Sequence, residues 1–266
     1  MRTTLFFFVT LSLTPAICQA SLIAYYNFDN AGNTFADSSG GGRNITGTAG
    51  TAPIWGATTG FNNTGGYDFT AGRLIAPVDV NPGSMPAMSW GAWVRTDSVA
   101  SGLRKIMGHD NGAWDRTLGL DNRNPGTFRY SAFTGDDPVN NSGPVEGGPG
   151  PVNTTDWTFI AATHDQIAKT VTLYIDMNAS TTGDALISIT EPAGFGAGFN
   201  TFAIGDIRPD ATSEPWDGAI DNVFVFNEVL SAATLTSFRN AGGVPEPSGA
   251  LLGMLGIMTA LVRRRR

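Results

Sequence analysis

Glycine, asparagine, aspartate and proline interrupt this chain so often that they leave little room for long helices. Glycine alone makes up 34 of the 266 residues, about 13%, against ~7% in an average soluble protein. Clusters such as residues 140–144, Asn-Asn-Ser-Gly-Pro, and residues 147–150, Gly-Gly-Pro-Gly, are typical of turns and loops. Short strands joined by turns are therefore the structure that this sequence favours.

Four apolar segments between these clusters have the patterns of β-strands. Residues 88–94 and 171–176 alternate, which predicts one buried face in each strand and places Trp93 on the opposite face. The predicted buried faces hold Met88, Trp90, Ala92, Val94, Val171, Leu173 and Ile175. Residues 157–163 and 220–226 are apolar on both faces, as expected of central strands that are covered on both sides. The pattern predicts one all-β domain.

The charge and the single cysteine limit the function classes. The 16 basic residues include Arg2 and the four final arginines, and the 23 acidic ones include Glu246, so residues 21–244 carry about −11. Nucleic acid is excluded as a partner, because phosphate binding relies on clustered Lys and Arg. An acidic surface suits divalent cations or simply keeps the protein soluble. Because Cys18 lies in the leader, thiol chemistry is excluded from the remaining chain.

The start of the chain has the features of a secretion signal. Arg2 gives it a basic beginning, and residues 5–13 form an apolar stretch. The small residues Cys18 and Ala20 stand three positions and one position before Ser21, as a signal peptidase requires. Residues 1–20 are therefore predicted to be removed by cleavage between Ala20 and Ser21.

The other end of the chain has three parts in a fixed order: a proline-glutamate-proline motif, an apolar stretch over 249–262 and a basic cluster. The motif comprises Val244, Pro245, Glu246, Pro247 and Ser248, and the cluster comprises Arg263, Arg264, Arg265 and Arg266. Residues 244–266 closely resemble the PEP-CTERM sorting signal. About 15 apolar residues in a helix cover ~22 Å of a ~30 Å hydrocarbon core, and snorkelling arginines make up much of the difference.

This resemblance implies an export route. The arginines should hold the end of the tail in the cytoplasm, which leaves the domain outside the inner membrane of a Gram-negative bacterium. An exosortase-type protease is expected to cut near the proline-glutamate-proline motif, so the tail would hold the protein in the membrane only transiently. The protein would then reach the cell surface or an extracellular, exopolysaccharide-containing biofilm. The alternative is a permanent tail anchor.

The order of the intervening segments resembles the laminin G-like jelly-roll family, which has the concanavalin A-like fold. The matching segments are residues 25–29, 37–40, 66–69, 88–94, 157–161, 171–176, 203–205, 216–223 and 227–231. The resemblance implies a two-sheet antiparallel sandwich over residues 21–243 with a short closing helix. Ser231 is the expected N-cap of that helix, while Thr234 replaces the glutamate of a reciprocal capping box.

The family resemblance also implies a structural calcium ion where the end of the first strand meets the last strand. Asp29 and Asp221 are the corresponding positions, and Ca²⁺ prefers several oxygen ligands that include one or two carboxylates. In the alternative interpretation, Asp29 accepts turn hydrogen bonds and Asp221 caps the sheet edge.

The sequence contains no recognisable catalytic constellation. Glucanases of this fold carry Glu-x-Asp-x-x-Glu on one strand, so that alternate carboxylates share a face, and this chain has no such run. Residues 214–217, Glu-Pro-Trp-Asp, are interrupted by proline and indicate a loop. His109 and His164 each precede an aspartate, but no Gly-x-Ser-x-Gly elbow accompanies them, so both are expected to be ordinary loop residues.

Candidate ligand-binding residues are Trp114 and Asp115, in a polar glycine-containing loop, and Trp216. An exposed indole beside aspartate and asparagine is suited to stacking on a sugar ring, although either tryptophan could instead pack in the core. We therefore predict a non-catalytic surface or matrix module that binds a glycan or a surface protein. The alternatives are a structural matrix protein without a discrete ligand and a glycan hydrolase.

Overall fold

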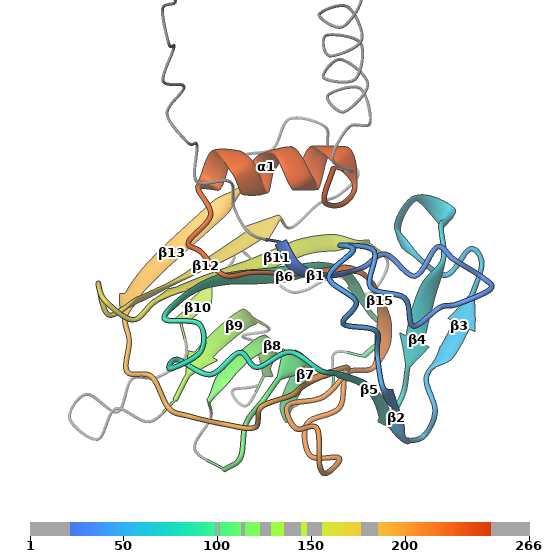
Figure 1. Cartoon of the computed structure of the whole chain (residues 1–266), viewed down its shortest axis with the longest axis horizontal. Helices are drawn as coiled ribbons and strands as arrows, with labels where there is room; N and C mark the ends of the chain where they lie inside the picture. The colour runs from blue at the N-terminus through green and yellow to red at the C-terminus, as the bar shows by residue number, and fades with distance from the viewer. Residues whose placement is uncertain are drawn as a thin grey trace, which may run out of the picture.

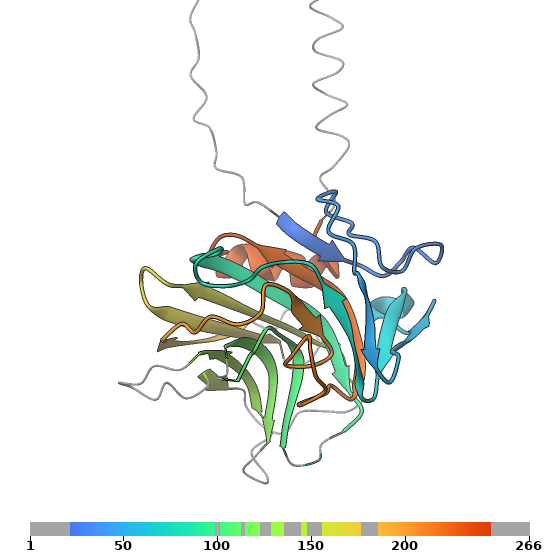
Figure 2. The ribbon, with the colours of Figure 1, turned by 60° about the horizontal axis from the view of Figure 1, so that its bottom comes forward.

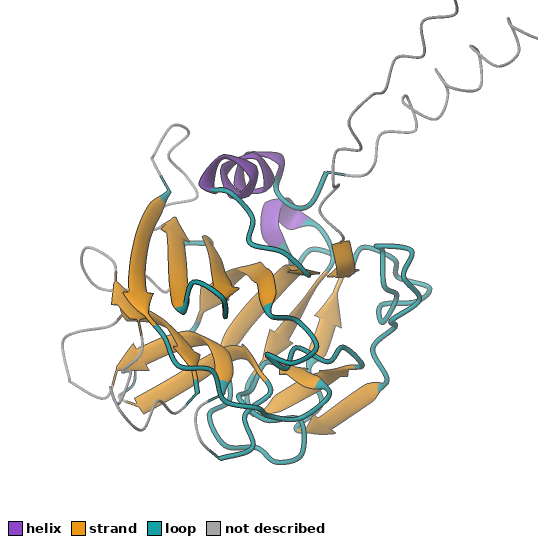
Figure 3. Cartoon of the chain, turned by 60° about the vertical axis from the view of Figure 1, so that its left-hand side comes forward, coloured by secondary structure: helices purple, strands orange, loops and turns teal. Residues whose placement is uncertain are grey.

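The computed structural model describes residues 22–245, apart from 99, 101, 113–114, 123–128, 136–144, 148–155 and 177–185. Two antiparallel sheets pack face to face, and one helix covers the outside of the first (Figures 1 and 3). The predicted all-β sandwich is therefore confirmed.

The first sheet has the strand order β13-β12-β11-β6-β15-β4-β3, and β1 also pairs with β15. Its strands are β1 (Leu22–Tyr26), β3 (Ile54–Gly56), β4 (Gly66–Phe69), β6 (Ala87–Thr96), β11 (Thr158–Asp165), β12 (Thr170–Asp176), β13 (Ile187–Pro192) and β15 (Gly218–Phe226). Because β6 and β15 lie at its centre, their residues are buried on both faces.

The second sheet has the order β10-β9-β8-β7-β14-β5-β2. Its strands are β2 (Gly47–Gly50), β5 (Gly72–Ala76), β7 (Gly102–Gly108), β8 (Arg116–Asn122), β9 (Arg129–Thr134), β10 (Val145–Gly147) and β14 (Phe202–Ile204). Figure 1 shows this sheet on the side of the molecule away from the helix α1.

The main core lies between the two sheets and follows the predicted alternation. It holds every residue that the sequence placed on a buried face: Met88, Trp90, Ala92, Val94, Val171, Leu173 and Ile175. Trp93 faces the other way, as predicted. In β11, Ile160 and Ala162 belong to this core, whereas Phe159 and Ala161 belong to a second cluster on the outer face. The prediction of central strands that are apolar on both faces is therefore also confirmed.

The second cluster is covered by α1 (Ala232–Ala241). Phe238 of the helix packs on Phe224 and Phe226, with ring centroids 5.7 and 5.5 Å apart. Arg239 forms a buried ion pair with Asp176 at the end of β12, including a 2.9 Å hydrogen bond from Nη2. The helix is thereby fixed to the sheet by apolar packing and by one buried charge pair.

The two ends of the described chain leave from the same face. Leu22, the first residue of β1, and Val244, just beyond α1, both pack against the second cluster, and β1 and α1 lie on the same side in Figure 2. Among the described residues, no helix has the length and apolar character needed to cross a membrane.

Candidate functional site

The candidate site begins at an irregularity in β15. Residues 218–220 of this strand pair with β4, whereas residues 223–226 pair with β1 along the same edge. Its register with β6 shifts between Asp221 and Phe224, and Asn222 has a φ of 54°. Two successive polar residues therefore form a bulge that separates β1 from β4.

Residues 60–65, which include the short 3₁₀ turn η1 (Phe61–Asn63), approach β15 at this point. The backbone N–H of Phe61 donates to Asp221 Oδ2 over 2.9 Å, and Thr64 Oγ1 lies 3.2 Å from the same oxygen. A β-carbon on Gly60 would stand 2.6 Å from that carboxylate oxygen, so the close approach requires glycine. Asp221 thus fixes this segment against the sheet.

A chain of hydrogen bonds connects β15 with β1. Asp221 Oδ1 accepts a hydrogen bond from the backbone N–H of Asn222 at 2.6 Å, and Asp221 Oδ2 accepts one from the side-chain Nδ2 of Asn222 at 3.0 Å. The Tyr25 hydroxyl donates to Asn222 Oδ1. A β-carbon on Gly243 would stand 2.3 Å from the Tyr25 hydroxyl oxygen, so the backbone that follows α1 passes directly over this chain.

Asp29 contacts the same segment from the turn that follows β1. Phe28 has a φ of 54°, which turns the chain immediately before Asp29. Asp29 Oδ1 accepts the backbone N–H of Gly65 over 2.9 Å, and its own N–H points at Asn27 Oδ1 over 3.4 Å. Unlike Asp221, Asp29 is exposed.

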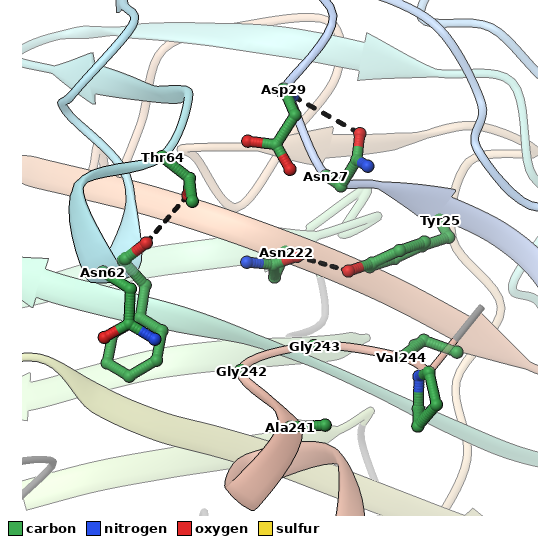
Figure 4. Close-up of a pocket in the computed structure, with 12 residues that line it drawn as sticks. Tyr25, Asn27, Asp29, Asn62, Thr64, Asn222, Ala241, Gly242, Gly243 and Val244 are labelled. Atoms are coloured by element: carbon green, nitrogen blue, oxygen red, sulfur yellow. Dashed lines mark hydrogen bonds between the residues drawn. The ribbon is translucent and has the colours of Figure 1, made fainter.

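These groups line a cavity of about 310 Å³ (Figure 4). The polar side chains on its wall are Tyr25, Asn27, Asp29, Asn62, Thr64 and Asn222. Residues 241–245, from the end of α1 to Pro245, form the opposite wall. The cavity therefore combines neutral amides, hydroxyls and one carboxylate, a set that can both donate and accept hydrogen bonds.

The electrostatics of the site centre on Asp221, which is fully buried. Burial raises the pKa of its carboxyl group to about 8, and the charge of Asp29 adds to this increase. The hydrogen bonds from Phe61 and Asn222 act in the opposite direction. A bound cation would favour the ionised form of this carboxyl group.

The chemistry of the predicted calcium ligands fits a hard cation. Asp29 and Asp221 both contact residues 60–65, and Asp29 Oδ2 accepts no hydrogen bond from the described residues. The side-chain oxygens of Asn27 and Asn62 line the adjacent cavity and are of the kind that Ca²⁺ prefers. Within the described ranges, no three His, Cys, Asp or Glu side chains gather as a metal centre.

Of the predicted ligand-binding residues, Trp216 and Asp115 are described, and neither lines this cavity. Trp216 is fully buried in the main core, which corresponds to the core-packing alternative and removes its indole from the ligand-accessible surface. Asp115 is also buried, and its Oδ2 accepts the N–H of Asn111 at 3.2 Å. Trp114 lies outside the described residues, as do Ala20, Ser21 and the sorting residues Glu246, Pro247, Ser248 and Arg263 to Arg266.

The prediction that both histidines are ordinary loop residues is wrong for His164, whereas His109 does lie in a loop. His164 lies within β11, and His109 directly follows β7; both are fully buried. Burial lowers the pKa of His109 to about 4 and that of His164 well below its ordinary value. The alternation of β11 carried the missed information, because His164 shares its parity with the core residues Ile160 and Ala162.

Sequence reasoning missed most of the cavity wall, including Tyr25, Asn27, Asn62, Thr64 and Asn222. One local feature could have indicated it: Asp221 and Asn222 are adjacent polar residues inside an otherwise apolar strand, a pattern typical of a bulge. The contribution of residues 60–65 has no comparable local feature, because tertiary contacts bring it there.

Two curved antiparallel sheets with one covering helix place the molecule in the class of jelly-roll sandwiches. The chain belongs to the family described as the concanavalin A-like lectin/glucanases superfamily, whose Laminin_G_3 model matches residues 72–236. The laminin G-like resemblance is therefore confirmed. Among curated proteins, none matches the sequence.

Several solved structures share the fold. Domain 4 of AbnA, a GH43 extracellular arabinanase from Geobacillus stearothermophilus, was solved with arabinotriose; it is 19% identical, with a TM-score of 0.55, over 82% of this chain and 98% of that chain. The binding domain of botulinum neurotoxin DC in complex with rat synaptotagmin II is 15% identical, with a TM-score of 0.59, over 84% of this chain and 52% of that chain. The same toxin domain in complex with SialylT is 15% identical, with a TM-score of 0.57, over 84% of this chain and 51% of that chain.

This chain spans about half the length of the toxin binding domains and nearly all of the arabinanase domain. At these identities the likeness shows the fold alone. The neighbours comprise binding domains and one domain of a glycan hydrolase, so the fold is shared by proteins that bind and by an enzyme that cleaves glycans.

Proposed function

We propose that this protein is an exported, non-catalytic module that binds a glycan in the cavity between β1, residues 60–65 and the end of α1. The observation that carries the proposal is the lining of that cavity, where amide, hydroxyl and carboxylate groups alternate as donors and acceptors. Sugar hydroxyls both donate and accept hydrogen bonds, so such a mixed lining complements them.

The size of the cavity limits the size of the ligand that it can hold. Ligand pockets in proteins span ~300–1,000 Å³, and this cavity of about 310 Å³ lies at the lower end. One or two sugar units, such as the end of a polysaccharide chain, fit this volume better than an extended polymer. The arabinotriose complex of the arabinanase domain supports glycan binding by this fold.

A glycan array probed with the purified protein, with and without calcium, tests the proposal. Asn62→Ala removes a wall residue whose side chain is exposed, and is expected to weaken binding about three- to tenfold, as for one lost hydrogen bond. Asn63→Ala is the matched control, because Asn63 is also exposed and has nearly the same φ, 61° against 57°, but does not line the cavity.

The outcomes separate the alternatives. Binding that is weakened in Asn62→Ala and retained in Asn63→Ala supports the cavity as the site. An array without any sugar bound contradicts glycan binding and favours a protein ligand or a structural matrix role. Release of shorter saccharides from a bound glycan would assign a hydrolase instead.

We also propose a calcium ion held by Asp29 and Asp221 beside the cavity, where it would neutralise two nearby carboxylates. The export route proposed for the whole chain is cleavage by signal peptidase, transient anchoring by residues 244–266 and processing by an exosortase-type protease. That route would deliver the module to the cell surface or to an exopolysaccharide matrix.

A further inference from the structure

A polar cluster interrupts the main core far from the cavity. Arg116 begins β8 and has the parity of the core residues Leu118 and Leu120, so it points between the sheets. His164 of β11 has the parity of Ile160 and Ala162 in the facing sheet. Arg116 and His164 are each fully buried. The Arg116 Cζ atom lies 5.5 Å from the centroid of the Phe195 ring, and the centroid of the His164 ring lies 6.4 Å from it.

The Arg116 guanidinium is only partly satisfied. Its Nη1 donates to the carbonyl oxygens of Val80 at 2.7 Å and Met85 at 2.8 Å. Its Nε and Nη2 are buried and have no hydrogen-bond partner among the residues that the structure describes. A buried donor without an acceptor destabilises a fold, and the effect is greater for a charged group.

Two further N–H donors lie in the facing sheet, where His164 approaches the same Phe195 ring as Arg116. Neither ring nitrogen of His164 has a partner within the described part of the chain, and one of them carries a proton in the neutral ring. The Trp90 indole packs edge-to-face on His164 at 5.9 Å, and its Nε1 is also buried without an acceptor. Arginine, histidine and tryptophan thus present N–H groups within one enclosed, otherwise apolar region.

No carboxylate of the described residues forms an ion pair with this positive charge. Asp79 interacts with Arg116 electrostatically, but it forms no ion pair with it. Its Oδ1 accepts two hydrogen bonds from Asn81, and its Oδ2 accepts one from Ser84 at 2.5 Å. An uncompensated charge in an apolar interior is strongly unfavourable, so a counter-charge would stabilise the cluster.

His109 extends the same cluster toward the loop edge. Its Nδ1 lies 3.0 Å from the carbonyl oxygen of Phe199, so Nδ1 carries the proton and donates. Its Nε2 is buried without a partner among the described residues, and burial together with the charge of Arg116 lowers the pKa of the ring. The cluster therefore contains one permanent positive charge and two neutral imidazoles.

We infer that the side chains of Arg116, His164 and Trp90 form an internal binding site for a small monovalent anion of halide size. A halide carries a single charge and accepts hydrogen bonds from any direction, which suits N–H donors on three separate elements. The complete burial of the three side chains favours a monoatomic ion over a larger oxyanion. This site is independent of the glycan cavity.

Thermal unfolding of the full-length chain in a non-ionic detergent tests the inference. At constant ionic strength, replacing gluconate with chloride is expected to raise Tm by roughly 2–4 °C at about five times the Kd, with saturation. Arg116→Met retains the length of the side chain but removes its charge and donors, and should remove the chloride dependence. Arg208→Met is the control, because Arg208 is partly exposed and paired with Asp210.

Bromide provides a second measurement that does not depend on a variant. Crystals of the wild-type protein grown in bromide should give an anomalous peak within hydrogen-bond distance of Arg116 Nε or Nη2. Chloride dependence that persists in Arg116→Met would place the ion elsewhere and overturn the inference. A wild-type Tm that is equal in both salts, or a bromide map without a peak at Arg116, would overturn it as well.

Discussion

At the scale of single residues, Asp221 determines how the candidate site responds to pH. Its folded-state pKa of about 8 lies above the ordinary value of 3.8. A raised pKa contributes stability that is fully present below the unfolded value and is lost as pH rises through the folded value. The metal-free protein should therefore lose stability between about pH 4 and pH 8, by about 1.4 kcal/mol for each unit of the pKa increase.

Calcium should counteract this loss. A cation that binds only the folded protein stabilises it by mass action, and it would be most strongly held where Asp221 is ionised. Addition of EDTA is therefore expected to lower Tm more at pH 8 than at pH 5, and Asp221→Ala should abolish the effect of EDTA. Circular-dichroism melting curves at the two pH values measure this.

Asp210→Ala is the matched control for the calcium experiment. Asp210 forms an exposed ion pair with Arg208, away from the cavity, so the variant should retain the wild-type response to EDTA. If EDTA leaves the wild-type curves unmoved at both pH values, Asp29 and Asp221 do not hold calcium and serve as hydrogen-bond acceptors for residues 60–65 and, in the case of Asp221, for Asn222.

At the scale of elements, α1 shows how local chemistry positions one wall of the cavity. Ser231 has extended backbone angles and accepts the N–H of Thr234 over 3.1 Å, which confirms it as the N-cap. At the other end, Gly242 adopts a left-handed conformation with φ 83° and ends the helix. Residues 241–245 then pass over Tyr25 and Asn222.

Ser231→Ala is expected to reduce the free energy of unfolding by about 1 kcal/mol, because the N–H of Thr234 loses its acceptor. Urea denaturation of the two proteins measures the difference. Ser237→Ala is the control, since Ser237 lies exposed within the same helix and its hydroxyl bonds only the Thr234 carbonyl. Equal losses in both variants would mean that the serine cap contributes nothing specific.

The strands that sequence reasoning predicted correctly have one of two local patterns. In β6 and β12 apolar residues alternate with period two, and in β11 and β15 a continuous apolar run predicts a strand that is covered on both faces. The family resemblance supplied the sheet arrangement and brought Asp29 and Asp221 to one place. Neither result required information about distant contacts.

The cavity could not be predicted in the same way, because its wall depends on contacts between distant segments. Asn222 adopts a left-handed conformation within a strand, and residues 60–65 reach β15 through hydrogen bonds to a residue 160 positions away. The loop prediction for His164 failed for a different reason, because this residue lies at the end of a strand and precedes Asp165. Polar neighbours at a strand end resemble a loop, whereas the strand parity of His164 places it in the core.

At the scale of the whole molecule, the tail is expected to be a processed sorting signal. Replacing Pro245, Glu246 and Pro247 with alanine leaves the apolar stretch and the terminal arginines intact, so insertion should be retained. If a protease reads the motif, the variant should accumulate as full-length protein in the inner membrane while wild type loses its tail. Mass spectrometry of protein recovered from the native host measures the C-terminus.

Ser248→Ala is the control, because it changes only the last residue of the motif, keeps Pro245, Glu246 and Pro247, and should be processed like wild type. A mature wild-type chain that still ends at Arg266 would contradict processing and support a permanent anchor. In that case the alanine variant and wild type should have the same mass apart from the substitutions.

The position of residues 241–245, between the cavity and the C-terminal tail, also bears on how an anchored protein would be oriented. If the protein is anchored through the chain that follows Pro245, as we propose, the cavity would lie on the side of the anchor and the second sheet on the opposite side. A polysaccharide end captured in the cavity would lie in the layer between the domain and its support. In this orientation the protein would hold a polysaccharide close to the cell envelope and would not present its binding site to ligands farther from the cell.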